Sequence, residues 1–328
     1  MSSHKNVVSF EIPQAVGETR EVPQQYGDPR EAPHQFESRD PQRAVVRADR
    51  PIGAILVEEG KLTTSEVERV LQVAKARGIR FGEAAVRLGL VTESEVRFAL
   101  SKQYDFPLLR HDPTSRDAQP SNELVAAFAP FHPRTEEIRA LRTQLLIRWY
   151  KRESGHNALV IASPDSAEGR SYVAANLAVV FSQLGARTLL LDADMRRPRQ
   201  HKIFGLPGGH GLSALLSGRA EKTATFPIPG LSRLSVLPAG ALPPNPQELL
   251  SRMAFTTLVR DMQSLYDVVI IDTPPSNKYA DAQAVAYRTG NALVVARKDH
   301  TSLGATNRVV RELAGTGARV VGTVINQY

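Results

Sequence analysis

Short apolar runs alternate with amphipathic stretches over residues 135–328. Six runs predict strands, at 157–163, 187–193, 233–238, 267–272, 291–297 and 318–325. The stretches between them predict helices at 135–150, 170–184, 246–264, 281–287 and 303–315. Because the strand runs are apolar at almost every position, we expect a parallel sheet covered on both faces. The alternation of strands and helices predicts a doubly wound α/β domain.

Residues 50–110 carry a different pattern, an internal repeat. Residues 53–71 align without gaps with residues 82–100. The repeated positions are Gly53, Val57, Gly60, Thr63, Ser65, Glu66, Val67 and Leu71, which return as Gly82, Val86, Gly89, Thr92, Ser94, Glu95, Val96 and Leu100. Each copy predicts a short helix ended by a glycine, followed by a helix that begins with a Thr–Glu capping box. We expect the two helix pairs to pack into one small domain.

The remaining segments lack such periodicity. Residues 1–49 are rich in Pro, Gln, Arg and Glu and predict a disordered leader. Residues 111–134 are polar and rich in proline, which is typical of a linker. The expected order is therefore a leader (1–49), a two-repeat helical domain (50–110), a linker (111–134) and a nucleotide-binding domain (135–328).

The amino-acid composition excludes only a few classes of function. The chain has 41 basic and 34 acidic residues, a net charge of +7 that suits phosphates, anionic lipid or nucleic acid, or serves solubility alone. The absence of cysteine excludes disulfides, thiolate chemistry and cysteine metal sites. No apolar run approaches the roughly 18 residues of a membrane span, and residues 1–14 do not resemble a signal peptide. We expect a cytoplasmic protein.

Residues 163–171, SPDSAEGRS, lie between a predicted strand and a helix. This is the layout of a phosphate-binding loop, in which backbone N–H groups and the helix dipole face an anion. In the pattern G-x-x-x-x-G-K-[ST], Pro164 replaces the first glycine and Arg170 the lysine. Gly169 lets the backbone approach, Arg170 would reach the outer phosphates, and Ser171 is placed to bind Mg²⁺. The alternative is a strand–turn–helix without a ligand.

Three aspartates support the phosphate-binding interpretation. Asp192 and Asp194 lie at the carboxyl end of one predicted strand, and Asp272 lies at the carboxyl end of another. Ligands of open α/β sheets bind at the carboxyl ends of strands. Carboxylates beside apolar runs need a cation or a basic partner, and Mg²⁺ prefers such oxygen ligands. Any one of these aspartates alone would be explained equally well as a turn or helix cap.

Taken together, residues 135–328 resemble the cytoplasmic kinase domain of the bacterial tyrosine kinases of exopolysaccharide chain-length regulation, in particular the stand-alone EpsG-like subgroup. The resemblance rests on SPDSAEGRSYVAANLA (Walker A), LLLDADMRRP (the second, aspartate-rich Walker motif), VVIIDTPP (Walker B), GALPPNPQELL and VVGTVINQ. It implies a P-loop domain that binds ATP and Mg²⁺ and phosphorylates tyrosine. Arginine in place of lysine departs from the general motif, and guanidinium and ammonium are not equivalent.

The resemblance also implies roles for individual residues. Arg170, Asp192 and Asp194 are implied to be catalytic, and Ser171, Asp192 and Asp272 to bind the metal. The nucleotide would contact Ser166, Ala167, Glu168, Gly169, Arg170, Ser171, Tyr172 and, at the adenine, Asn326. Glu136, Arg139 and Arg142 match the family's motif for subunit contact and imply a homo-oligomer.

The implied partner is an inner-membrane polysaccharide chain-length determinant, which would recruit this chain to the membrane face; no nucleic acid is expected. The family phosphorylates a tyrosine cluster at its C-terminus, whereas here Tyr328 is the single tail tyrosine. Two alternatives to a kinase stay open. One is an ATP-binding regulatory subunit with little phosphotransfer. The other is a MinD/ParA-type positioning ATPase, although Asp165 stands where that class has a second lysine.

The repeat of residues 50–110 resembles the N-terminal domain of type II secretion and pilus ATPases, some of which bind cyclic di-GMP. In the second copy, Arg80, Gly82 and Gln103 match the implied dinucleotide residues. The first copy departs from the pattern, because Arg50 is one position too far from Gly53 and Ala74 replaces the glutamine. A protein-docking module is the alternative.

Overall fold

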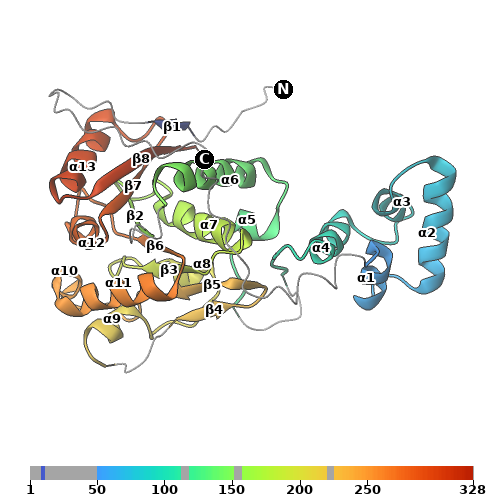
Figure 1. Cartoon of the computed structure of the whole chain (residues 1–328), viewed down its shortest axis with the longest axis horizontal. Coiled ribbons are helices and arrows are strands. Elements are labelled where there is room, and N and C mark those ends of the chain that lie inside the picture. The colour runs from blue at the N-terminus through green and yellow to red at the C-terminus, as the bar shows by residue number, and fades with distance from the viewer. Residues whose placement is uncertain (1–8, 12–49, 112–117, 151–156, 220–224, 328) are drawn as a thin grey trace. The chain divides into compact units, whose positions relative to one another are not determined.

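The computed structural model describes residues 9–11, 50–111, 118–150, 157–219 and 225–327 (Figure 1). The described residues separate into two compact units, a small one within residues 37–108 and a large one that combines residues 109–327 with Ser9–Glu11. Most of the predicted leader lies outside the described residues, as does Tyr328. Within the leader, Ser9–Glu11 form a short strand, β1, which the composition did not predict. No helix in the described parts of the chain has the length and apolarity to cross a bilayer.

The small unit contains the two predicted helix pairs. They are α1 (Ile52–Glu58) with α2 (Thr64–Arg77), and α3 (Phe81–Arg87) with α4 (Glu93–Gln103). Both capping boxes form: the Thr63 and Thr92 N–H groups donate to Glu66 and Glu95 at 2.7 and 2.8 Å. The apolar side chains of both pairs build one core, so the unit has an interior of its own.

The glycines that open the two copies are explained by packing. A Cβ on Gly82 would lie 2.6 Å from Cγ1 of Val96, and one on Gly53 would lie 3.1 Å from Cγ1 of Val67. In both copies, then, glycine lets the first helix approach a valine of the second. The repeat of glycine and valine in the sequence follows from this contact.

The large unit is built on an eight-stranded sheet in the order β1-β8-β7-β2-β6-β3-β5-β4. The six predicted strands are β2 (Ala158–Ala162), β3 (Thr188–Asp192), β5 (Leu231–Leu237), β6 (Val268–Asp272), β7 (Asn291–Arg297) and β8 (Arg319–Asn326). All neighbours among these six are parallel. The two edge strands, β1 and β4 (Phe226–Ile228), are antiparallel and were not predicted.

Helices cover both faces of the sheet, as a doubly wound fold requires (Figure 1). One face carries α5 (Val125–Phe128), α6 (Pro133–Arg148) and α7 (Arg170–Gln183). The other carries α9 (Leu212–Leu216), α10 (Pro246–Ser251), α11 (Met253–Leu265), α12 (Asp281–Thr289) and α13 (Leu303–Gly315). Side chains alternate along β2: Leu159 and Ile161 face the first layer, whereas Val160 faces the second.

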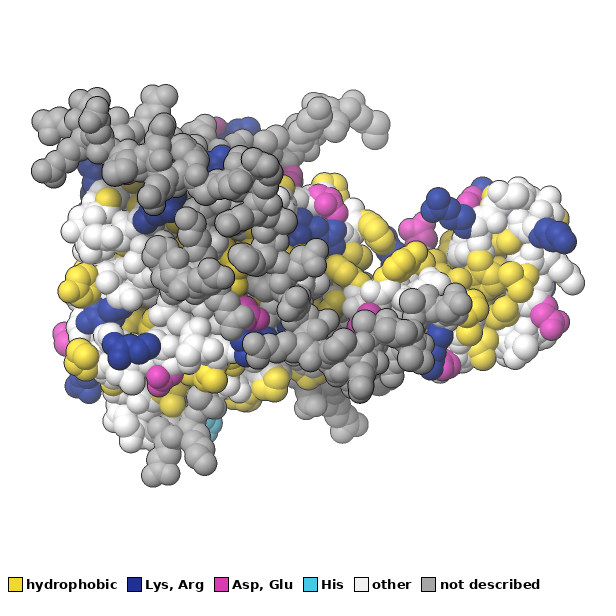
Figure 2. All heavy atoms as spheres, viewed as in Figure 1, with side chains coloured by type: hydrophobic (Ala, Val, Ile, Leu, Met, Phe, Trp, Pro, Cys, Tyr) yellow, Lys and Arg dark blue, Asp and Glu magenta, His cyan; other side chains and the backbone are white. Residues whose placement is uncertain are grey.

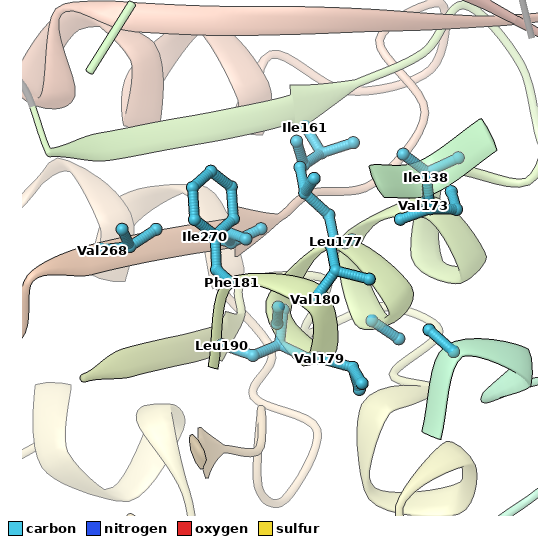
Figure 3. Packing of buried hydrophobic residues seen from close by; sticks show 14 of the residues in the cluster. Ile138, Ile161, Val173, Leu177, Val179, Val180, Phe181, Leu190, Val268 and Ile270 are labelled. Atoms are coloured by element: carbon cyan, nitrogen blue, oxygen red, sulfur yellow. The ribbon is translucent and has the colours of Figure 1, made fainter. Parts of the chain in front are cut away.

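Helix α7 is the centre of the first layer. Twelve of its side chains are buried, among them Val173, Leu177 and Phe181. Figure 3 shows these residues against Ile161 of β2 and Ile270 of β6. The single tryptophan of the chain, Trp149, is buried at the end of α6 and meets Phe181 edge-on, with ring centroids 6.4 Å apart. This packing fixes the start of α7, where the phosphate-binding loop ends.

Two predicted boundaries differ from the structure. The helix expected over 246–264 is two helices, because Arg252 between α10 and α11 has extended backbone (φ −74°, ψ 155°). The described part of the expected linker belongs to the large unit. In that segment Leu124 is fully buried, and the Ala126 N–H donates to Asn176 of α7 at 3.0 Å. Because this segment is polar and rich in proline, its short helix α5, which packs on α7, was not predicted.

Candidate active site

The predicted phosphate-binding loop connects β2 to α7. Gly169 adopts the left-handed conformation (φ 88°) at the N-cap of α7, which a residue without a Cβ does at low cost. Ala167 also has positive φ, 61°, a strained value for a residue with a side chain. The loop therefore holds a sharp turn in front of the N-terminus of α7, where backbone N–H groups suit an anion.

Glu168 stabilises this turn from the inside. Its carboxylate accepts hydrogen bonds from the Asp165 N–H, at 2.7 Å, and from the Thr301 hydroxyl. Asn326 donates to the Glu168 carbonyl at 3.1 Å. Burial raises the pKa of Glu168, while the hydrogen bonds from Thr301 and Asp165 act in the opposite direction. Glu168 was predicted to contact the nucleotide, but its side chain is buried in the protein, so its backbone is the part available to a ligand.

Arg170, the first residue of α7, is folded onto the carboxylates. Its Nε donates to Asp272 Oδ1 at 3.2 Å, its Nη2 to Asp194 Oδ2 at 3.3 Å, and its Nη1 to the Ser163 hydroxyl at 2.7 Å. All four side chains are buried. The guanidinium fork thus joins the loop, the Walker B strand β6 and the segment after β3.

The two aspartates at the end of β3, Asp192 and Asp194, have different surroundings. Both carboxylate oxygens of Asp192 accept backbone N–H groups, from Asp194 at 3.1 Å and from Arg199 and Gln200 at 3.2 and 3.0 Å. Asp192 therefore holds the start of the short helix α8 (Gln200–Ile203). Asp194 accepts two backbone N–H groups on Oδ1 and leaves Oδ2 to Arg170. Of the two aspartates, Asp194 therefore has one oxygen, Oδ2, that is bound by a side chain and not by the backbone.

Burial governs the charge of this cluster. The pKa of Asp192 is raised well above its usual value, first by burial and then by the neighbouring Asp272 charge. Burial also raises the pKa of Asp272, although Arg170 and hydrogen bonds from Ser171 and Gln200 oppose this. Three buried carboxylates share one buried cation, since Arg170 is the only Lys or Arg side chain among the described residues that is buried. An added divalent cation would improve the charge balance.

The oxygen donors near Asp272 fit Mg²⁺. Ser171 lies close enough to Asp272 to act against the rise of its pKa, and P-loop NTPases hold Mg²⁺ with this pair of residue types and the nucleotide phosphates. Within the described ranges, no cluster of three or more His, Cys, Asp or Glu side chains could hold a metal by itself. The side chains therefore fit a magnesium ion that is completed by phosphate and water, the usual arrangement for this ion.

A cavity of about 730 Å³ opens in front of the loop. Its volume lies in the range of about 300–1,000 Å³ typical of small-molecule sites. Four of the predicted nucleotide residues line it: Ala167, Gly169, Tyr172 and Asn326. The opposite wall comes from residues 122–138, which include the segment expected to be a linker.

Sequence reasoning missed several polar residues of the site. Gln200 donates to Asp272 at 2.8 Å and to the Ser171 carbonyl at 3.2 Å, and its side chain is fully buried. Ser163 accepts from Arg170, and Arg134 lines the cavity. The one available signal was position: Ser163 lies at the carboxyl end of a strand run, as the predicted aspartates do.

The predicted subunit-contact motif lies on α6. Arg139 donates to the Pro130 carbonyl at 2.8 Å and pairs with Glu136. Arg142 donates to the Val180 carbonyl of α7 at 2.8 Å, and burial lowers its pKa. Both arginines therefore have partners within the chain, and Glu136, with 60% of its side chain exposed, is the most accessible member. Their role in subunit contact stays a prediction.

The candidate dinucleotide residues belong to the small unit. Arg80 is the exposed N-cap of α3, and Gln103 ends α4. The helix packing described above accounts for Gly82. Cyclic di-GMP binding therefore gains no support from the geometry.

Comparison with known proteins shows the family to which the chain belongs. The family model described as ParA, NUBPL iron-transfer P-loop NTPase, matches residues 155–327, just over half of the chain. The putative tyrosine-protein kinase CapB of Staphylococcus aureus is 35% identical over 193 residues, which cover 59% of this chain and 84% of CapB. The chain belongs to the P-loop NTPases and, among them, to the bacterial tyrosine kinases.

Further members of the tyrosine kinase family agree. Tyrosine-protein kinase wzc of Salmonella typhi is 34% identical over 62% of this chain, a match that spans only 28% of wzc. The solved kinase domain of Escherichia coli tyrosine kinase ETK aligns with a TM-score of 0.61 and 30% identity, and covers 66% of this chain and 84% of that domain. The family and the kinase fold predicted from the Walker motifs are confirmed, whereas the relation of the small unit to secretion ATPases is still untested.

Proposed function

We propose that this chain is an ATP-dependent, autophosphorylating protein tyrosine kinase that regulates exopolysaccharide polymerisation and export. The observation that carries the proposal is the cavity of about 730 Å³ against the loop, with the Arg170–Asp194–Asp272 cluster at the start of α7. A nucleotide in the cavity would place its phosphates at the N-terminus of α7. Phosphoryl transfer depends mainly on positioning and charge stabilisation, and these residues supply both.

In this proposal each charged residue has one task. Ser171 and Asp272 hold Mg²⁺, which would neutralise phosphate charge when bound. Asp194 orients the acceptor hydroxyl, and Asp192 keeps the Asp194 segment in place through its three backbone hydrogen bonds. Tyr172 and Asn326 contact the nucleotide from the cavity wall.

Arg170 must change partners for this site to work. In this structure it pairs with both Asp194 and Asp272. Phosphate oxygens are a strong bidentate partner for guanidinium, and Mg²⁺ would take over the neutralisation of Asp272. We infer that Mg-ATP draws Arg170 from the carboxylates to the phosphates and frees Asp194 for the acceptor.

Phosphate mapping by mass spectrometry after incubation with Mg-ATP tests the proposal. We expect phosphotyrosine in the purified protein and its loss in Asp194→Asn, with ATP binding retained in equilibrium dialysis. Arg170→Ala should weaken ATP binding, and unchanged affinity would show that the loop is not the site. Bound ATP without any phosphotyrosine would instead support the regulatory subunit. The positioning ATPase predicts ATP hydrolysis without protein phosphorylation.

The family resemblance supplies the rest of the proposal. An inner-membrane chain-length determinant would recruit the kinase to the membrane face, and the Glu136–Arg139–Arg142 surface of α6 would join subunits into a homo-oligomer. Charge reversal at Glu136, the most exposed of the three, tests the second point. We expect Glu136→Arg to reduce the oligomer in sedimentation velocity, and an unchanged oligomer would exclude this surface.

For the small unit, protein docking is better supported than dinucleotide binding. Figure 2 shows apolar side chains gathered on the visible face of this unit. Its exposed large apolar residues are Val57, Leu71 and Tyr104. Exposed apolar surface of this kind suits a protein partner. Calorimetric titration of the full chain with cyclic di-GMP separates the two: binding that Arg80→Ala removes would restore the dinucleotide hypothesis.

A further inference from the structure

A second cavity, of about 580 Å³, lies beside the segment that carries Asp194. It is bounded by the loop after β3, helix α8, a glycine-rich turn and the segment after β5. The residues used below are Arg197, Arg199, His201, Lys202, Gly209 and Gly240. None of the roles proposed above uses this cavity.

The charge of the cavity is strongly positive. Of its cations, Arg199 pairs with Glu123. Arg197 and Lys202 form no ion pair within the described part of the chain, and both are exposed. Burial and the neighbouring Lys202 charge lower the pKa of His201, as expected in a positive field. Two free cations at one cavity are available to an anionic ligand.

The adjacent Arg196 is not part of this surface. It forms a bidentate pair with the buried Asp281, at 2.9 and 3.0 Å, and stacks over the ring of Tyr279. The first arginine after Asp194 in the sequence is therefore fixed in the protein, and the next cations along the chain line the cavity.

The floor of the cavity is preformed. The Leu212 and Ser213 N–H groups donate to the carbonyls of Pro238 and Ala239 at 2.8 and 2.9 Å. These bonds bring Gly211 so close to Gly240 that a Cβ on Gly240 would lie 2.9 Å from the Gly211 nitrogen. On the other side, an added Cβ at Gly209 would meet nothing within 4 Å. A fixed floor, and glycines without side chains on one side, leave room for an extended peptide backbone beside the basic residues.

The cavity is also joined to the reacting centre. The Arg197 N–H donates to Asp194 Oδ1 at 2.9 Å, so the residue that begins the cavity wall is bound to the carboxylate assigned to the acceptor hydroxyl. A polypeptide whose tyrosine lies at Asp194 would therefore have neighbouring residues within reach of Arg197 and Lys202.

We propose that this cavity binds acidic residues beside the acceptor tyrosine and so selects acidic substrate segments. The inference rests on the proposed kinase function and adds its substrate class. Clusters of Arg and Lys recognise acidic motifs in this way, and complementary charge mainly sets specificity and encounter rate.

Calorimetric titration of the full-length protein, without ATP, tests binding separately from transfer. The probes are two peptides with one central tyrosine, flanked on each side by three glutamates or by three glutamines. We expect the acidic peptide to bind roughly tenfold more tightly at low salt and to lose this advantage at high salt. The double variant Arg197→Glu/Lys202→Glu should bind both peptides alike and still bind ATP.

The control is Arg308→Glu/Arg311→Glu, an equal charge change on exposed residues of α13, which contacts β7 and β8 and not the cavity. Equal binding of the two peptides, or an equal loss of preference in the control, would overturn the inference. So would hyaluronate binding in the absence of acidic-peptide binding, because the ligand would then be a polysaccharide. Phosphorylation of both peptides at one rate would leave the kinase proposal standing without the substrate class. Binding of the acidic peptide without any phosphorylation would support an acidic-peptide site and contradict the kinase proposal.

Discussion

Arg170 connects the polar residues of the candidate site through one side chain. As the only buried Lys or Arg within the described ranges, it holds Asp194 and Asp272 and closes the loop onto Ser163. Removing one partner of a buried ion pair costs more than the pair itself contributes, because the other charge stays buried and unpaired. Arg170 is thus a structural residue of the fold as well as a nucleotide-binding residue in the proposed complex.

We therefore predict that Arg170→Ala lowers the free energy of unfolding of the ligand-free protein by about 3 kcal/mol. Arg170→Lys should lose less, because lysine keeps the charge but not the three-way contact. Burial raises the pKa of Asp272. Since a protonated carboxyl needs no cation, the loss should become smaller as pH falls. Urea denaturation measures it, with Arg308→Ala expected to change stability by less than about 0.5 kcal/mol. A variant as stable as the control would contradict this role.

Residue types at strand ends predicted which side chains meet, but not what each one does. Asp192 and Asp272 end two neighbouring strands and pair in register, and Asp194 comes two residues later, so their proximity follows from the apolar runs. The sequence could not show that the Asp192 carboxylate would accept hydrogen bonds from the backbone of residues 194, 199 and 200. Those bonds depend on the path of the chain after β3. Gln200 was missed for the same reason.

At the scale of elements, the repeat in the small unit is a repeat of one helix contact. Gly82 and Gly53 each face a valine of the following helix, at different closeness. Valine is stiff at χ1 and cannot turn away easily. The same substitution in the two copies therefore compares the cost of this contact at two distances within one protein.

We predict that Gly82→Ala destabilises the small unit by about 1–3 kcal/mol, the usual cost of overpacking. Gly53→Ala should cost less, because its Cβ would have 0.5 Å more room: 3.1 against 2.6 Å. Hydrogen exchange at α3 and α4 measures the effect in the full chain. Adding Val96→Ala to Gly82→Ala should recover part of the loss, and a purely additive result would exclude the contact as its cause.

The capping box at Thr92 gives a second prediction for the same unit. Hydrogen bonds from the Thr92 backbone and from Lys61 lower the pKa of Glu95 to about 2. A lowered carboxylate pKa stabilises the folded state above the unfolded value and loses that effect as pH falls through the folded value. Glu95→Gln should therefore cost about 1 kcal/mol near pH 7. The difference from the parent should vanish as pH falls from the ordinary glutamate pKa of 4.5 to about 2.

Acid titration of the circular dichroism of Glu95→Gln and its parent checks this dependence. Glu93→Gln is the matched control on the first turn of the same helix, since Glu93 is 76% exposed and its carboxylate lies 4.0 Å from Arg97. A control that loses as much as Glu95→Gln would show that general charge, and not the cap, is responsible.

Elements with a strong periodic signal were predicted, and short elements that depend on tertiary contacts were not. The six central strands have apolar side chains on both faces. In contrast, β4 has three residues and owes its existence to pairing with β5. Helix α5 has four residues and forms because Leu124 and Ala126 pack on α7. Local composition carries no information about such contacts.

The whole molecule consists of two units with separate cores, and the candidate active site uses only one of them. The residues that line the cavity and bind Arg170 all belong to the large unit. The apolar cluster of the small unit contains no residue beyond Ala99 among its buried members. Neither unit needs the other for a hydrophobic interior.

We predict that residues 109–328 bind Mg-ATP within about twofold of the full chain, and that residues 37–108 alone unfold cooperatively with helical circular dichroism. Equilibrium dialysis and thermal melting of the two fragments and the full chain are the measurements. A large fragment that is folded but binds no nucleotide would show that the small unit completes the site, contrary to the geometry.

The position of the single tryptophan has a practical consequence. Trp149 lies in the core of the large unit against Phe181 of α7, and the chain has no other tryptophan. Its intrinsic emission therefore reports on the nucleotide-binding unit alone, whatever state the small unit is in. A spectral shift on adding Mg-ATP would follow a change in α7 packing without any attached label, in the unmodified protein.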